Sequence, residues 1–185
     1  MTAEAAADPL VWGHGSKRLE VFLEPTCPFS GRAFGKFDEL LARAGEARLT
    51  LRIRLQSQPW HCFSPTLTRA VLAAATTAGG KAAAKAVLAA IYARRDDFEP
   101  KDHCQGPLLD QSPSALLHAL EQHTGLALRP AYEDPALTVE QKWQARYARQ
   151  NGIHVSPTFM IDGLVVPDMG SGDPVDAWLG KLGLA

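Results

Sequence analysis

The run Glu24-Pro25-Thr26-Cys27-Pro28-Phe29-Ser30 places a cysteine between a predicted strand and a predicted helix. Before it, residues 17–23 alternate apolar and charged side chains, which predicts a strand that becomes buried on both faces near its end. After it, apolar residues recur at helical spacing over residues 28–44, and Gly45 ends the helix. We therefore expect Cys27 to lie at a helix N-terminus.

This position gives Cys27 its chemical interest. Unpaired backbone N–H groups and the positive end of the helix dipole favour thiolate over thiol. Such sites lower a cysteine pKa from roughly 8.5 to about 3.5–7.5, and the thiolate is the nucleophile in disulfide exchange. Pro28 fits the first helical turn, and Ser30 can donate a hydrogen bond to the sulfur. The alternative is that Cys27 is a small buried hydrophobe.

The segments on either side extend this unit into a sheet. Residues 48–55 alternate Leu and Ile with Thr and Arg, which predicts a half-exposed strand at or near a sheet edge. Residues 17–55 thus form a strand-helix-strand unit, which should cross over right-handed and pair its strands in parallel. Residues 10–12 can add a further strand.

The rest of the chain is first helical and then returns to strands. Periodic Ala-rich and Leu-rich stretches predict helices at about 65–78, 81–95, 113–124 and 136–150, with Gly and Pro loops between them. Residues 155–166 read as a hairpin that turns at Asp162-Gly163. A final helix covers residues 173–182, with Asp173 as N-cap and Pro174 at the first position.

A second motif, Ser156-Pro157, supports the interpretation of Cys27. A proline that enters a strand cannot donate to the hydrogen-bond ladder, and a cis bond in a tight turn is one place where it fits. In a β-α-β … β-β-α order, this loop lies beside the start of the first helix. Two distant motifs are therefore expected to converge.

The run from Phe22 to Ser30 resembles the active-site turn of the thioredoxin superfamily, and more narrowly that of DsbA-like disulfide oxidoreductases and protein disulfide isomerases, whose Cys-Pro-x-Cys opens the first helix. The resemblance implies an α/β thioredoxin fold (β-α-β … β-β-α), with a thioredoxin-like domain over 1–62 and 151–185 and an inserted helical subdomain over 63–150. It also implies that Cys27 is the nucleophile and Pro157 the cis-proline. Pro28, Phe29 and Ser156 would contact the substrate, a disulfide-containing protein or glutathione, and no cofactor is expected.

The sequence departs from this family at Ser30, which stands where the motif has its second cysteine. A two-cysteine site resolves its mixed disulfide internally, whereas Cys27 alone needs an external thiol. This favours glutathione-linked or isomerase-like exchange over net oxidation of substrates. Two alternatives stay open: a binding or chaperone module without turnover, and a glutathione enzyme similar to the kappa-class transferases, in which a serine of the turn is the key residue.

Four further residues can lie near Cys27. Trp60, His61 and Cys62 follow the second predicted strand, and sites in α/β sheets gather at the carboxyl ends of parallel strands. His61 would stabilise a thiolate and Cys62 would be a candidate resolving thiol, unless Trp60 and Cys62 simply pack at the hinge of the insert. Glu24 is either a proton acceptor or an ordinary strand-end residue.

Composition restricts the function classes. The 185 residues carry a formal net charge of -1 with mixed signs, so no nucleic-acid or membrane partner is expected. The first ten residues lack a signal pattern, which favours a soluble cytoplasmic protein, or a periplasmic one if a signal was removed. No metal site is expected, because no CxxC occurs and Cys62 and Cys104 each have only an adjacent histidine. Oligomeric state stays open.

Overall fold

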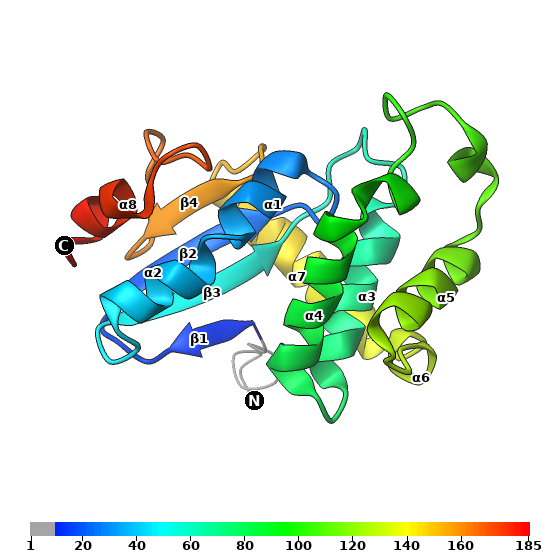
Figure 1. The fold of residues 1–185 in the computed structure, drawn as a ribbon, viewed down its shortest axis with the longest axis horizontal. Helices are drawn as coiled ribbons and strands as arrows, with labels where there is room; N and C mark the ends of the chain where they lie inside the picture. The colour runs from blue at the N-terminus through cyan, green and yellow to red at the C-terminus, as the bar shows by residue number, and fades with distance from the viewer. Residues whose placement is uncertain (1–9) are drawn as a thin grey trace.

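The computed structural model describes residues 10–185, whose five strands form one sheet in the order β1-β3-β2-β4-β5 (Figure 1). The first nine residues of the predicted 1–62 segment lie outside this described part. The strands are β1 (Val11–Gly13), β2 (Lys17–Leu23), β3 (Leu49–Leu55), β4 (Thr158–Ile161) and β5 (Leu164–Val165). Strands β2 and β3 are parallel, as predicted, and the other pairs are antiparallel.

Helices connect and cover these strands. They are α1 (Pro28–Phe34), α2 (Phe37–Ala44), α3 (Ser64–Thr76), α4 (Gly80–Ala93), α5 (Pro113–Thr124), α6 (Arg129–Tyr132), α7 (Ala136–Gln150) and α8 (Val175–Leu182), with 3-10 turns η2 (Arg95–Asp97) and η3 (Pro107–Asp110). Helices α1 and α2 pass in front of the sheet and α7 runs behind it, while α3 to α6 stand beside it (Figure 1). No helix in residues 10–185 combines the length and apolar character needed to cross a bilayer.

Alternation along β2 explains why this strand is covered on both faces. Leu19, Val21 and Leu23 point into the main core beneath α1 and α2. Phe22 points to the other face, where it packs with residues of α7 and β4 in a second, smaller core. The main core also includes buried residues of α3, α4 and α5, so the helical insert shares one hydrophobic core with the sheet.

The structure corrects the predicted half-exposed strand over residues 48–55. Arg54 is only 5% exposed, because α7 covers that face of β3. Its guanidinium lies over the rings of Trp143 and Tyr147, and its Nε donates to Glu20 Oε2 at 2.7 Å. Tyr147 adds a hydrogen bond to the other oxygen of Glu20 at 3.0 Å. The two other polar residues on this face of β3 are partly exposed, as the alternation predicts, whereas Arg54 belongs to a buried, paired cluster.

The predicted helix over residues 28–44 is two helices. It breaks at Gly35-Lys36, where Gly has a low helix propensity. Lys36 Nζ donates to the backbone carbonyls of Ser171 (2.7 Å) and Asp173 (2.6 Å), in the segment before α8. Lys36, at this break, therefore links the α1-α2 segment to the segment that precedes α8.

Two smaller expectations concern the C-terminal part. The hairpin turn at Asp162-Gly163 is present between β4 and β5. The last helix starts at Val175 with Pro174 in the cap position, so the predicted N-cap Asp173 is wrong. The carboxylate of Asp173 instead accepts a hydrogen bond from the N–H of Gly170 at 2.8 Å, because it closes the preceding turn.

We predict that Arg54→Ala lowers the free energy of unfolding by about 3–5 kcal/mol, because Glu20 keeps a buried carboxylate without its nearest partner. Urea titration followed by circular dichroism measures this. Arg43→Ala, which removes an exposed arginine that pairs with Asp176, is the matched control and should change stability little. Equal losses for the two variants would contradict the assignment of Arg54 as a buried structural charge.

Candidate active site

Cys27 lies where the carboxyl end of β2 turns into α1. It caps this helix with extended backbone angles (φ −71°, ψ 121°), and Pro28 begins the first turn. The carbonyl of Cys27 accepts a hydrogen bond from Gly31 N–H at 3.0 Å. The residue is 7% exposed. The predicted placement of the thiol at a helix N-terminus is therefore confirmed.

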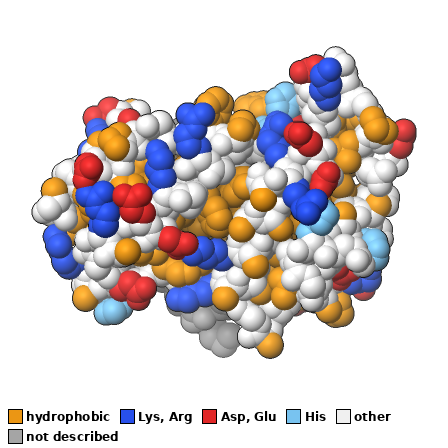
Figure 2. All heavy atoms as spheres, in the orientation of Figure 1, with side chains coloured by type: hydrophobic (Ala, Val, Ile, Leu, Met, Phe, Trp, Pro, Cys, Tyr) orange, Lys and Arg blue, Asp and Glu red, His pale blue; other side chains and the backbone are white. Residues whose placement is uncertain are grey.

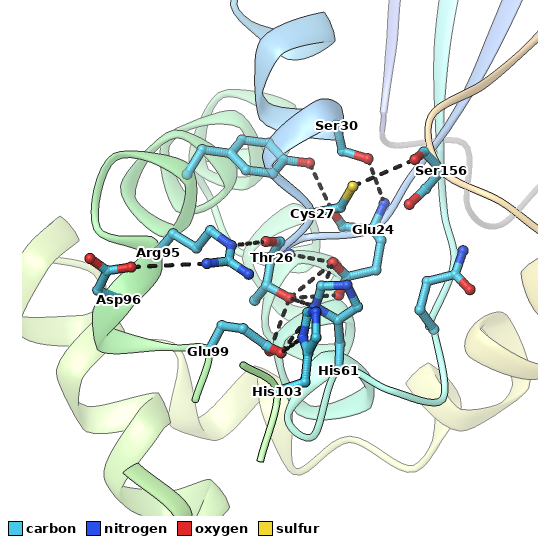
Figure 3. A network of polar contacts seen from close by, with 12 residues as sticks. Glu24, Thr26, Cys27, Ser30, His61, Arg95, Asp96, Glu99, His103 and Ser156 are labelled. Atoms are coloured by element: carbon cyan, nitrogen blue, oxygen red, sulfur yellow. Dashed lines mark hydrogen bonds and ion pairs between the residues drawn. The ribbon is translucent and has the colours of Figure 1, made fainter. Parts of the chain in front are cut away.

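The Ser156-Pro157 loop lies beside this cysteine. The peptide bond between the two residues is cis, in agreement with the sequence analysis. Cys27 Sγ is 3.5 Å from the carbonyl oxygen of Ser156 and donates a hydrogen bond to it (Figure 3). Side chains that follow β3 hold the loop: Gln56 donates to the carbonyl of Val155 at 2.7 Å, and Gln58 to that of His154 at 3.3 Å. The two distant motifs converge as predicted.

Ser30 is in a different role from the one expected. Its side chain is fully buried, and its hydroxyl accepts a hydrogen bond from the backbone N–H of Glu24 at 3.2 Å. Within residues 10–185, the predicted hydrogen bond from Ser30 to the Cys27 sulfur is not found, and the contact with Glu24 is the one that the Ser30 hydroxyl makes. The reason is that the strand ends one turn below the cysteine, which leaves the N–H of Glu24 in need of an acceptor inside the protein.

A cavity of about 290 Å³ opens beside Cys27. Its lining comes from the helix start, the loop after β3, η2 with the loop that follows it, and the cis-proline loop: Cys27, Pro28, Phe29, Gln58, Trp60, His61, Arg95, His103, Val155 and Ser156. Phe29 and Trp60 are 53% and 51% exposed, so the cavity has apolar walls that face solvent. The predicted neighbours Trp60 and His61 thus reach the site.

Cys62 and Cys104 are both exposed. Cys62 Sγ donates to the backbone carbonyl of His103 at 3.2 Å, and neither cysteine lines the cavity beside Cys27. Cys62, the candidate resolving thiol, therefore points toward the loop that contains His103 and not into the cavity beside Cys27.

A polar network lies behind Cys27, centred on Thr26 (Figure 3). The N–H of Thr26 donates to Glu24 Oε2 at 2.7 Å, and its hydroxyl contacts Glu24 Oε2 at 2.9 Å and His61 Nδ1 at 2.7 Å. Glu24 and Thr26 are fully buried. Burial raises the pKa of the Glu24 carboxyl, and the charge of His61 and the hydrogen bonds from Thr26 oppose that rise only in part.

The helical insert supplies further partners that the sequence analysis missed. Tyr92 of α4 donates its hydroxyl to the carbonyl of Glu24 at 3.2 Å, and Arg95 Nε donates to the carbonyl of Thr26 at 2.6 Å. A side chain at Gly31 would place its Cβ 3.0 Å from the ring of Tyr92, so this glycine lets α1 approach α4. Burial, and then the nearby Glu24 and Cys27, raise the pKa of Tyr92 well above its ordinary value.

Two histidines meet a buried glutamate on the far side of Thr26. Glu99 Oε1 is 3.3 Å from His61 Nδ1 and 2.6 Å from His103 Nδ1. Burial acts to raise the pKa of Glu99, but hydrogen bonds and charges from the two histidines outweigh it, so this pKa lies below its ordinary value. The donor atoms of the three residues lie within 4.8 Å of one another, a spacing that can hold a metal ion. This group was not predicted, because its three residues come from two separate parts of the chain and only adjacent Cys-His pairs stand out in the sequence.

The fold and this site define a thioredoxin-fold protein with a single cysteine at the start of its first helix. Comparison with solved structures agrees with this class. The structure titled as a "putative protein-disulfide isomerase" from Pseudomonas syringae is 56% identical, with a TM-score of 0.93 over 95% of this chain and 98% of that one. The chain belongs to the same family, the DsbA-like thiol-disulfide oxidoreductases of the thioredoxin fold.

More distant structures share the fold alone. DsbA2 from Pseudomonas aeruginosa is 18% identical, with a TM-score of 0.67 over 97% of this chain and 95% of that one. DsbA from Xylella fastidiosa is 17% identical, with a TM-score of 0.65 over 91% of this chain and 86% of that one. No protein-family model matches the sequence, and a search of curated proteins finds no match.

We predict that Ser30→Ala lowers the free energy of unfolding by about 1–3 kcal/mol, because the buried N–H of Glu24 loses its acceptor. The rate at which iodoacetamide alkylates Cys27 should stay unchanged, since Ser30 does not bond to the sulfur. Chemical denaturation and intact-mass kinetics measure the two effects. Ser114→Ala, at an exposed serine of α5, is the control. An altered alkylation rate with unchanged stability would favour the Ser30-sulfur contact instead.

Proposed function

We propose that the protein is a monothiol thiol-disulfide oxidoreductase in which Cys27 is the nucleophile. The Cys27 thiolate attacks one sulfur of a protein disulfide or of a glutathione mixed disulfide, and the other sulfur leaves as a thiolate. An external thiol such as glutathione then attacks the mixed disulfide, takes the substrate sulfur and releases Cys27 as thiolate. One observation carries this proposal: Cys27 Sγ stands at the start of α1 and faces the Ser156 carbonyl at 3.5 Å in the cavity.

The surroundings of the sulfur suit a polypeptide that carries a disulfide. Phe29, Trp60 and Val155 are large exposed apolar residues on the cavity wall, and a substrate that covers them buries apolar surface. We assign Pro28 to the same wall, and the backbone of Ser156 and Pro157 to an extended substrate segment. Glutathione offers the same extended backbone and a thiol at its centre.

The burial of Ser30 favours Cys27 as the reacting residue. Ser30 is not part of the cavity wall, and its hydroxyl already accepts from Glu24 N–H. A serine in this position is poorly placed to orient the thiol of a bound glutathione. Cys62 is likewise outside the wall, which supports release by an external thiol. The cytoplasmic location stays a prediction, because this exchange also operates in other compartments that hold a thiol pool.

We predict that oxidised glutathione modifies Cys27 in a Cys62→Ser/Cys104→Ser background, which removes the two exposed thiols. Intact mass spectrometry should show one glutathione per chain, and reduced glutathione should remove it. The same background with Cys27→Ala is the control and should stay unmodified. A Cys27 thiolate that titrates at or above the pKa of a free thiol, together with no adduct, would overturn the proposed function.

We also predict that Ser30→Cys converts the site to internal resolution. A second thiol at position 30 can attack the mixed disulfide on Cys27, so the glutathione adduct should be replaced by an intramolecular disulfide. Mass spectrometry after brief exposure to oxidised glutathione distinguishes the adduct from the disulfide. Ser30→Ala is the matched control and should keep the adduct. An adduct that is equally stable in Ser30→Cys would show that position 30 cannot reach the sulfur.

A further inference from the structure

The group formed by His61, Glu99 and His103 joins two separate parts of the chain. His61 follows β3, whereas Glu99 and His103 follow η2 in the helical insert. The three side chains converge behind Cys27, next to Thr26 (Figure 3). The rings of His61 and His103 meet edge to face with centroids 4.7 Å apart. Both imidazole Nδ1 atoms face the same carboxylate oxygen, Glu99 Oε1, and His61 Nδ1 also lies 2.7 Å from the hydroxyl of Thr26.

Two buried carboxylates meet at this place and depend on the two histidines for their charge partners. The side chains of Glu24 and Glu99 are both fully buried. Within residues 10–185, the ion-pair partners found for these two carboxylates are the histidines, His61 for both and His103 for Glu99. Arg95 is close by but donates to the carbonyl of Thr26. Buried carboxylates are stable when they are paired with cations or coordinate a metal.

The donor set fits a divalent transition metal. Two imidazoles and one carboxylate are common ligands of Zn²⁺, with metal-ligand distances of about 2.0–2.2 Å. Such distances put neighbouring donors somewhat more than 3 Å apart in a tetrahedral site, and His61 Nδ1 and Glu99 Oε1 are 3.3 Å apart. His103 Nδ1, at 2.6 Å from Glu99, has to retreat slightly, and its side chain is 41% exposed and free to do so. Imidazole ligands disfavour Mg²⁺ and Ca²⁺.

We propose that His61, Glu99 and His103 form a binding site for Zn²⁺ or a similar divalent transition metal beside Cys27. Three protein ligands leave one position open, as in metal sites that exchange a water or a substrate group. His61 and His103 also line the cavity that contains Cys27, so the open position faces the thiol site. The proposal does not depend on the monothiol mechanism, because it rests on the arrangement of the three donor atoms and none of the three residues forms or breaks a sulfur bond.

The test uses the full chain with Cys62→Ser and Cys104→Ser, which removes thiols that could bind zinc next to the same histidines. Isothermal titration with ZnCl₂ should show one ion per chain, and CoCl₂ should give the visible absorption of a tetrahedral nitrogen-oxygen site. Glu99→Gln, which keeps the shape of the side chain, and His103→Ala, at a partly exposed residue, should each raise the dissociation constant at least roughly tenfold.

Controls separate this site from other sources of binding. His118→Ala removes an exposed histidine of α5 and should leave zinc binding unchanged, and Cys27→Ala should also bind one ion. Circular dichroism confirms that each variant is folded. The proposal is overturned if the chain binds no zinc, if Glu99→Gln and His103→Ala bind it as the parent does, or if binding is present only while Cys62 and Cys104 are intact.

Discussion

The polar backbone and side chains of residues 24–26 must find their partners inside the protein, and much of the site is built to meet that constraint. Strand β2 ends in full burial, and the turn to α1 leaves N–H and C=O groups without a ladder. Ser30 accepts from the N–H of Glu24, Tyr92 donates to its carbonyl, and Arg95 donates to the carbonyl of Thr26. These hydrogen bonds hold the backbone of the residues that precede Cys27, and in this way they fix the position of the cysteine.

The same constraint explains why the helical insert belongs to the site. Tyr92 and Arg95 come from the end of α4 and from η2, and Glu99 and His103 follow within the next eight residues. The insert therefore fills the space behind the turn with polar groups, while its other helices share the main hydrophobic core. Removing it would take Arg95 from the buried carbonyl of Thr26 and leave the carbonyl of Glu24 with only the N–H of Cys27, at 3.3 Å, at the cost that poorly satisfied buried groups carry.

Local sequence patterns were enough to predict much of the fold and the part of the site where Cys27 meets the Ser156-Pro157 loop. The alternation of apolar and polar residues predicts the strands. Pro28 and Pro157 are informative because a proline restricts the backbone within a few residues of itself. Features that depend on distant partners were missed, among them the break at Lys36, the burial of Arg54 and the group formed by His61, Glu99 and His103. The contact of Ser30 with Glu24 is local, but it depends on the path of the turn between them. Lys36 binds carbonyls 135 and 137 residues away, which no local period encodes. Arg54 is buried because α7 supplies two aromatic rings that cover it and β2 supplies its glutamate partner.

The two sides of Cys27 differ in the same way. Short sequence motifs form much of the side that faces the cavity, and residues far apart in sequence meet on the opposite side. The side of Cys27 that faces the cavity has apolar residues from short motifs, Phe29 at the start of α1 and Val155 before the cis-proline. The opposite side is polar, and the hydroxyl of Thr26 there contacts residues 35 and 73 positions away. Apolar walls in contact with solvent favour an apolar surface on any molecule that binds there, whereas buried charges contribute to the electric field at the sulfur. His61 and His103 belong to both sides, because they line the cavity and also contact Glu99 behind the thiol. A substitution of either histidine would therefore alter the cavity wall and the charge behind the thiol together.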